Sequence, residues 1–152
     1  MTMCAPRMDI MVNCERFERG KDASKHAPVL CTGEHIKNLE ACLFLNGQKL
    51  KDDFKRIRRR VEDLLAVRTM HATPDPIHIG FMCHAGRRSS VATCRLTIEA
   101  MKMSGYEVDD AYYLSENTWG DKNCSTCEDC DAKSDAKVYL YGIAQQMWSV
   151  AY

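Results

Sequence analysis

An apolar run followed at once by a polar, glycine-containing segment is the feature that most restricts how this chain folds. Residues 77–82 (IHIGFM) have the length and composition of a buried strand. They lead directly into residues 83–91 (CHAGRRSSV), which open a helix expected to continue to Met103 and to end at Gly105. Residues 106–114 then predict a further strand. A strand, a helix and a strand in this order form a right-handed parallel crossover, so the pattern predicts the α/β class with a mainly parallel sheet and flanking helices.

The flanking segments add a strand and three helices to this unit. Residues 9–13 are suited to a strand, and residues 34–46 predict a short helix that stops at Gly47. A longer helix is predicted over residues 49–70 and a C-terminal helix over residues 134–149. The long helix has one apolar stripe, spaced four, three, four and three residues apart: Leu50, Phe54, Ile57, Val61 and Leu64. A chain of 152 residues has the length of one compact domain, so residues 1–152 are expected to fold as one.

The strand-to-helix turn has the chemistry of an anion-binding site. Such a turn brings the unpaired amide groups of a helix N-terminus, and the positive end of the helix dipole, to one point. Glycine allows the backbone to approach a ligand, arginine matches phosphate, and serine hydroxyls cap the helix or donate to the anion. A capped turn with its arginines in solvent explains the same residues without a ligand. The predicted phosphate-binding residues are Cys83, His84, Gly86, Arg87, Arg88, Ser89 and Ser90.

The same segment resembles a loop of the RapZ C-terminal domain family, whose pattern is Cys-x-x-Gly-(Lys or Arg)-His-Arg-Ser-Val. Cys83, Gly86, Arg87, Ser90 and Val91 match this pattern, and Arg88 and Ser89 stand where the family has His and Arg. Residues 13–17 and 30–33 also resemble the family's early strand and its Leu-Thr-Gly turn. The resemblance implies a domain that binds an amino-sugar phosphate and takes part in binding small regulatory RNA. In bacteria the domain is joined to a P-loop kinase-like half, whose phosphate-binding motif this sequence does not contain.

A second motif is a cluster of three cysteines, Cys124, Cys127 and Cys130, within a predicted Cys-rich insertion at residues 119–131. Two overlapping Cys-x-x-Cys pairs let thiolates reach one tetrahedral ion from a tight turn, so the spacing predicts a zinc site. Free or redox-active thiols are the alternative. A fourth ligand would come from elsewhere in the fold, and the candidates are His84, Cys83, Cys94, Asp131 or a water molecule.

Basic residues are concentrated in residues 49–60, where seven cations and two aspartates leave an excess of five positive charges. The apolar stripe of the predicted helix is buried, so the cations fall on its exposed face. Solvation alone explains such a face, and an RNA or other polyanion patch is the alternative. Aromatic residues do not alternate with the cations, so stacking on bases is not indicated.

Composition restricts the compartment and the class of partner. Lys plus Arg and Asp plus Glu are 21 each, so the chain as a whole does not attract polyanions. No run approaches the roughly 20 apolar residues that cross a bilayer, and no membrane insertion is expected. Six of the nine cysteines are scattered singly, which favours a cytoplasmic or other reducing intracellular compartment over a secreted disulfide scaffold.

These observations favour a non-catalytic domain that binds a phosphorylated sugar or an RNA phosphate at residues 83–90. One alternative is a structural or interaction subunit of a larger assembly, with protein partners. The other is a Cys-dependent phosphatase in which Cys83 attacks phosphorus. Enzymes of that kind clamp the phosphoryl group with an arginine six residues after the cysteine, and that position here is Ser89.

Overall fold

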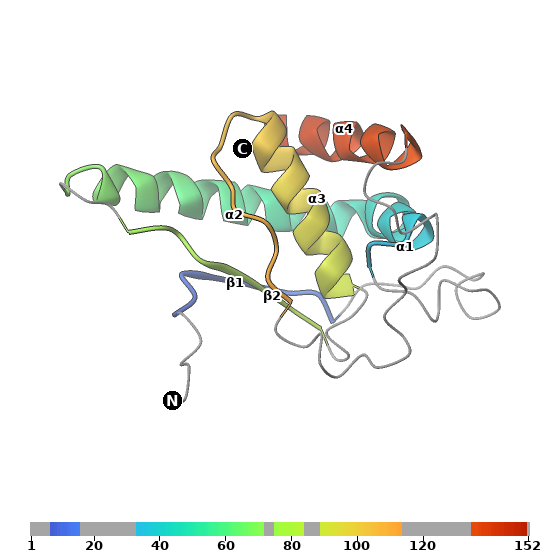
Figure 1. The fold of residues 1–152 in the computed structure, drawn as a ribbon, viewed down its shortest axis with the longest axis horizontal. Helices are drawn as coiled ribbons and strands as arrows, with labels where there is room; N and C mark the ends of the chain where they lie inside the picture. Colours follow the sequence, from blue (N-terminus) through green and yellow to red (C-terminus); the bar gives the residue numbers. More distant parts are fainter. Residues whose placement is uncertain (1–6, 16–32, 72–74, 84–88, 114–134, 152) are drawn as a thin grey trace.

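The structure is a computed structural model that describes residues 7–15, 33–71, 75–83, 89–113 and 135–151. In these ranges the chain folds into helices and a parallel strand pair, a mixed α/β arrangement (Figure 1). The elements in chain order are β1 (Ile10–Asn13), α1 (Ile36–Glu40), η3 (Ala41–Leu45), α2 (Gly47–Arg68), β2 (Ile79–Met82), α3 (Ser89–Met103) and α4 (Asp135–Ser149). Of the described helices, none combines the length and the hydrophobicity needed to cross a membrane.

The two strands pair in parallel, with Ile10 opposite Ile79 and Asn13 opposite Met82. Side chains alternate along β1, so Ile10 and Val12 are buried whereas Met11 and Asn13 are exposed. The helices lie on one side of the pair, and α1, η3 and α2 form the crossover between the strands (Figure 1). The two strands predicted from residues 9–13 and 77–82 are therefore confirmed. The parallel pair itself differs from the prediction, because it joins β1 to β2 and not residues 77–82 to residues 106–114.

The third strand, predicted over residues 106–114, is wrong for the part that the structure describes. Residues 106–113 belong to no strand, and β1 is the parallel partner of β2 instead. Tyr106 and Val108 pack against the core, and farther on the carboxylate of Asp110 pairs with Arg95 and accepts a hydrogen bond from the backbone N–H of Ala111. The side chain thus competes for the backbone and the sheet ladder does not form. The described sheet is a single pair of strands.

The helices around residues 34–70 differ from the prediction at one junction. The short predicted helix is α1 followed by the π-helical turn η3, and Asn46 ends it by donating its side-chain amide to the carbonyl of Ala41. Gly47 begins α2 instead of stopping a helix. The predicted apolar stripe is confirmed, because Leu50, Phe54, Ile57 and Val61 are buried and Leu64 packs against them.

The last two helices complete the core. α3 ends at Met103, and Gly105 follows with a φ of 96°, a conformation that favours glycine, so the predicted C-terminus of this helix is confirmed. α4 packs against α3 and α2. Its Trp148 packs edge to face against the rings of Phe54 and Tyr106, with ring centroids 5.5 and 6.1 Å apart. The C-terminal helix is also confirmed from residue 135 on.

Candidate functional site

The carboxyl end of the strand pair is the place where the predicted anion site begins. Cys83 directly follows β2, and α3 begins six residues later at Ser89. The Cys83 thiol donates a hydrogen bond to the hydroxyl of Ser90 at 3.1 Å, which ties the two ends of the turn together. His84, Gly86, Arg87 and Arg88 lie outside the described residues.

The structure places the two serines of the predicted site, Ser89 and Ser90, at the start of α3. Both lie inside the first turn of α3 rather than at its cap, and Ser90 is 4% exposed with its hydroxyl at Cys83. The Ser90 hydroxyl therefore has a partner inside the fold, and phosphate binding by the two serines stays a prediction. The first backbone N–H groups of α3 have no acceptor within the helix, so they can still bind an anion.

Three thiols from separate elements gather beneath the start of α3. Cys14 follows β1, Cys83 follows β2 and Cys42 comes from η3, where its sulfur lies 3.7 Å from the hydroxyl of Thr93. Burial raises the pKa of Cys14 to about 12, and hydrogen bonding to Thr93 offsets only part of this effect. Burial likewise raises the pKa of Cys42 to about 12. Sequence spacing does not reveal this group, although Cys14 and Cys83 each directly follow a predicted strand.

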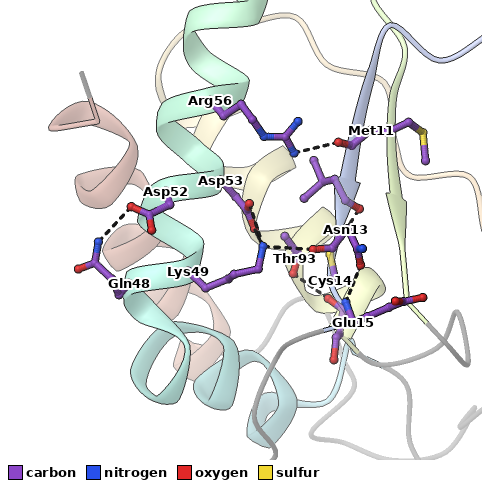
Figure 2. Close-up of polar contacts among 12 residues, drawn as sticks. Met11, Asn13, Cys14, Glu15, Gln48, Lys49, Asp52, Asp53, Arg56 and Thr93 are labelled. Carbon is purple, nitrogen blue, oxygen red and sulfur yellow. Dashed lines mark hydrogen bonds and ion pairs between the residues drawn. The ribbon is translucent and has the colours of Figure 1, made fainter.

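Cations of α2 cover the outer edge of β1 next to these thiols (Figure 2). The Lys49 ammonium donates to the carbonyl of Asn13 at 3.2 Å and to the carboxylate of Asp53 at 3.2 and 3.3 Å. Arg56 donates to the carbonyl of Met11 at 2.8 Å. Burial raises the pKa of Asp53, an effect that the hydrogen bond from Lys49 opposes. Part of the basic run therefore closes a strand edge and is not free for a ligand.

Of the remaining basic residues, one contacts another helix and the others lie on the exposed face of α2. Arg58 donates to the carbonyls of Trp148 and Ser149 at 2.9 and 3.1 Å, where it caps the C-terminus of α4. On the exposed face of α2 a shallow hollow of about 310 Å³ is lined by Asp52, Lys55, Arg56, Arg59, Arg60 and Asp63. Solvated cations therefore account for only part of the run, and the polyanion alternative stays a prediction.

A charge network, which the sequence did not predict, joins α3 to the segments on either side of it; Arg95 and Glu34 are mostly buried, and Asp110 is exposed. Arg95 forms ion pairs with Glu34 at 2.9 Å, Glu99 at 3.3 Å and Asp110 at 3.1 Å. The hydroxyl of Tyr113 also donates to Glu34. Most of these residues are far apart in the sequence, so no local spacing indicates that they meet.

Lys137 of α4 completes this network. Its side chain is fully buried, and its ammonium lies 3.8 Å from the second carboxylate oxygen of Glu34. The hydroxyl of Tyr141 is buried nearby with no hydrogen-bond partner in the described part of the chain, and burial followed by the charge of Glu34 raises its pKa above the usual range. The network joins residues that flank two of the undescribed segments, 16–32 and 114–134, and we interpret it as structural.

The predicted zinc site falls outside what the structure describes. Cys124, Cys127 and Cys130 all belong to residues 114–134. Within the described ranges no three His, Cys, Asp or Glu side chains lie close enough to hold a metal ion, and this includes the thiols of Cys14, Cys42 and Cys83. The zinc prediction and its fourth ligand therefore stay predictions.

Comparisons of the chain with family models, with curated proteins and with solved structures give no match. The residues and their geometry are therefore the basis on which a function can be assigned.

Proposed function

We propose that the turn between β2 and α3, residues 83–90, binds the phosphate of a phosphorylated sugar or of RNA without catalysis. The observation that supports this proposal most is the place of the turn. It connects the carboxyl end of a parallel strand to the N-terminus of a 15-residue helix. Ligands of open α/β sheets bind beyond the carboxyl ends of the strands, and helix N-termini favour anions there.

The residues that the turn carries fit the same ligand. Arg87 and Arg88 offer ten N–H donors between them by the count of five per guanidinium, and Gly86 leaves room for close backbone approach. Ser90 is held inward by Cys83, which fixes the first turn of α3 at the base of the loop. Binding of this kind needs donors and positive charge but no nucleophile.

Calorimetric titration with glucosamine 6-phosphate, with sulfate and with a short single-stranded RNA tests the proposal and separates the two sources of phosphate. The double variant Arg87→Gln/Arg88→Gln should lose binding. The matched control is Arg59→Gln/Arg60→Gln, an adjacent arginine pair on the exposed face of α2, which should retain it. Binding that survives the first variant, or that disappears equally in the control, would show that the turn is not the site.

The contact between Cys83 and Ser90 favours a second candidate, a Cys-dependent phosphatase. A hydroxyl 3.1 Å from the sulfur can donate to a thiolate, and the thiolate would attack phosphorus, displace the alcohol and leave a phosphocysteine for water to hydrolyse. Hydrolysis of an aryl phosphate that disappears in Cys83→Ser would support this candidate. Binding of phosphate without turnover would support the first proposal.

We also propose that Cys124, Cys127 and Cys130 hold one zinc ion. Three thiolates within seven residues stay close only if a cation offsets their repulsion, which supports the assignment. Elemental analysis should find about one zinc per chain. The ion should be lost from Cys127→Ser but kept in the control Cys42→Ser, and metal-free wild-type protein would exclude the site.

A further inference from the structure

The pairing of β1 with β2 brings two cysteines from distant parts of the sequence into register. Asn13 lies opposite Met82, and the backbone N–H of Cys14 still donates to the carbonyl of Met82 at 2.7 Å. Cys14 and Cys83 are therefore the next pair along the two strands. Neighbouring strands lie about 4.7–4.9 Å apart, which is inside the Cα separation of about 4.4–6.8 Å that disulfides span.

Both side chains also point to the same face of the strand pair. Residues opposite each other share a face, and the partners Ile10 and Ile79 are directed toward the core. Because side chains alternate between the two faces, Cys14 and Cys83, four residues farther along, point to the same face as Ile10 and Ile79. Both cysteines contact the core beneath α3. The sulfur of Cys83 touches Ser90, and that of Cys14 interacts with Thr93 one turn later on α3.

From this register we infer that Cys14 and Cys83 are a modification site, a dithiol that closes to a reversible disulfide by exchange with a low-molecular-weight disulfide such as oxidised glutathione. The strand spacing lies at the short end of the range for disulfides, and strained bridges are the more easily reduced ones. The other two cysteines of the described ranges are less suited, because Cys42 lies on η3 and Cys94 on α3, both outside the strand register.

The order of the two steps follows from exposure. Cys83 is partly exposed, so its thiolate attacks oxidised glutathione first; one Cys83–glutathione bond forms and one glutathione thiolate leaves. Cys14 is fully buried and reacts second: its thiolate attacks the sulfur of Cys83, closes the bridge and displaces the second glutathione thiolate. The protons of the two cysteine thiols pass to the two released glutathiones. Two cysteine sulfurs are oxidised and one external disulfide is reduced.

The site goes beyond the proposed phosphate binding and does not depend on it. Cys83 is also the first residue of the proposed turn, so a bridge would hold that end of the turn to β1. Phosphate titration of the reduced protein is a separate measurement, and its failure would leave the thiol chemistry untouched.

The test is incubation of the full-length chain with mixtures of reduced and oxidised glutathione, followed by alkylation and peptide mapping by mass spectrometry. We expect a peptide linked through Cys14 and Cys83 that reduced glutathione cleaves again. Cys14→Ser should instead accumulate glutathione on Cys83, because the second step is blocked. Cys94→Ser, a control on α3, should form the same bridge as the wild type.

Two results would overturn the inference. One is a bridge between Cys14 and Cys42, whose thiols also lie close together. The other is a glutathione adduct on Cys83 of the wild type that persists and is not converted to the Cys14–Cys83 bridge. Should Cys14→Ser fail to fold, Cys14→Ala tests the same point, because it should also accumulate glutathione on Cys83, and the wild-type peptide map shows the bridge directly.

Discussion

The two ends of the β1–β2 pair are held by different kinds of interaction. At the amino end, Arg68 donates to the carboxylate of Asp9 at 2.8 Å, and Asp9 also accepts the backbone N–H of His78 at 2.8 Å. At the carboxyl end the side chains are the thiols of Cys14 and Cys83 and the buried carboxylate of Asp53. The amino end is closed by charges with complete partners. At the carboxyl end, burial disfavours the charged forms of Cys14 and Asp53.

The two aspartates express this difference in their pKa values. The backbone N–H of His78, followed by Arg68, lowers the pKa of Asp9 despite partial burial. Burial raises the pKa of Asp53 although Lys49 opposes it. Burial thus dominates the pKa of the carboxylate at the carboxyl end, whereas hydrogen-bond donors dominate at the amino end, and carboxyl groups with pKa values raised by burial are more frequent at functional sites. Stability is therefore expected to depend on the amino end, and chemistry on the carboxyl end.

The largest effect on stability is expected outside both ends of the strand pair, at Glu34, which links the start of α1 to α3 and α4. Glu34→Gln removes the negative charge that faces both Arg95 and the fully buried Lys137. Breaking a buried pair leaves a charge without a partner, and we expect a loss of about 3 kcal/mol in the free energy of unfolding, measured in urea.

The control is Glu40→Gln, because Glu40 pairs with Lys37 on the exposed surface of α1 at 3.4 Å. A surface pair of this kind contributes at most about 0.5 kcal/mol. Equal losses in the two variants would mean that the ion pairs of Glu34 behave like a surface pair and not like a buried one.

The amino end should give the next largest effect. Arg68→Ala removes the ion pair with Asp9 and also the hydrogen bonds to the carbonyls of Asp75 and Pro76, at 3.0 and 2.7 Å. Hydrogen bonds to charged groups contribute about 1.5–3 kcal/mol, so a loss of about 2 kcal/mol is expected in the same unfolding experiment. Arg59→Ala, on the exposed face of α2, should change stability by less than about 0.5 kcal/mol. A loss of stability no greater than that of Arg59→Ala would show that the contacts of Arg68 at the amino end do not stabilise the fold.

How much of this was visible in the sequence differs between the two ends. Local periodicity predicted both strands, the stripe of α2 and the end of α3 at Gly105, because each depends on residues a few positions apart. The prediction of a third strand was wrong because the Asp110 side chain binds the backbone N–H of Ala111 and the guanidinium of Arg95. The alternation of apolar residues does not reveal this competition.

The candidate site was predictable only where it is continuous in sequence. The turn at residues 83–90 was predicted in the right place between β2 and α3, since strand, turn and helix follow each other directly. The meeting of Cys14 with Cys83, and of Glu34 with Arg95 and Lys137, depends on the strand register and on the packing of α4. No spacing rule encodes such contacts.

The pH dependence of stability should separate the two aspartates by sign. A folded pKa below the unfolded value adds stability above about pH 4, and this stability is lost as the pH falls. Asp9→Asn should therefore be less stable than the wild type at neutral pH, and the difference in the free energy of unfolding should shrink toward low pH. A raised folded pKa has the opposite effect: its contribution is present at low pH and is lost as the pH rises through the folded pKa. Asp53→Asn should therefore gain on the wild type as the pH rises above about 4, where an ordinary aspartate ionises. Urea unfolding at several pH values measures both slopes, and slopes of the same sign would contradict the division between the two ends.

The smallest effect on stability is expected at Ser90, where chemistry should change more than folding does. The Ser90 hydroxyl accepts from the Cys83 thiol at 3.1 Å, and the same hydroxyl can rotate and donate once the thiol is ionised. Ser90→Ala should cost no more than about 1 kcal/mol of stability but should slow alkylation of Cys83 by iodoacetamide about fivefold at neutral pH, because one hydrogen bond to the thiolate is lost. Ser89→Ala is the matched control in the same turn of α3, and it should leave the rate unchanged. The rate at Cys83 is read by mass spectrometry of its peptide, so the other cysteines do not interfere. If Ser90→Ala instead reduced stability strongly and left the alkylation rate alone, the carboxyl end would depend on this contact for folding, just as the amino end depends on Arg68.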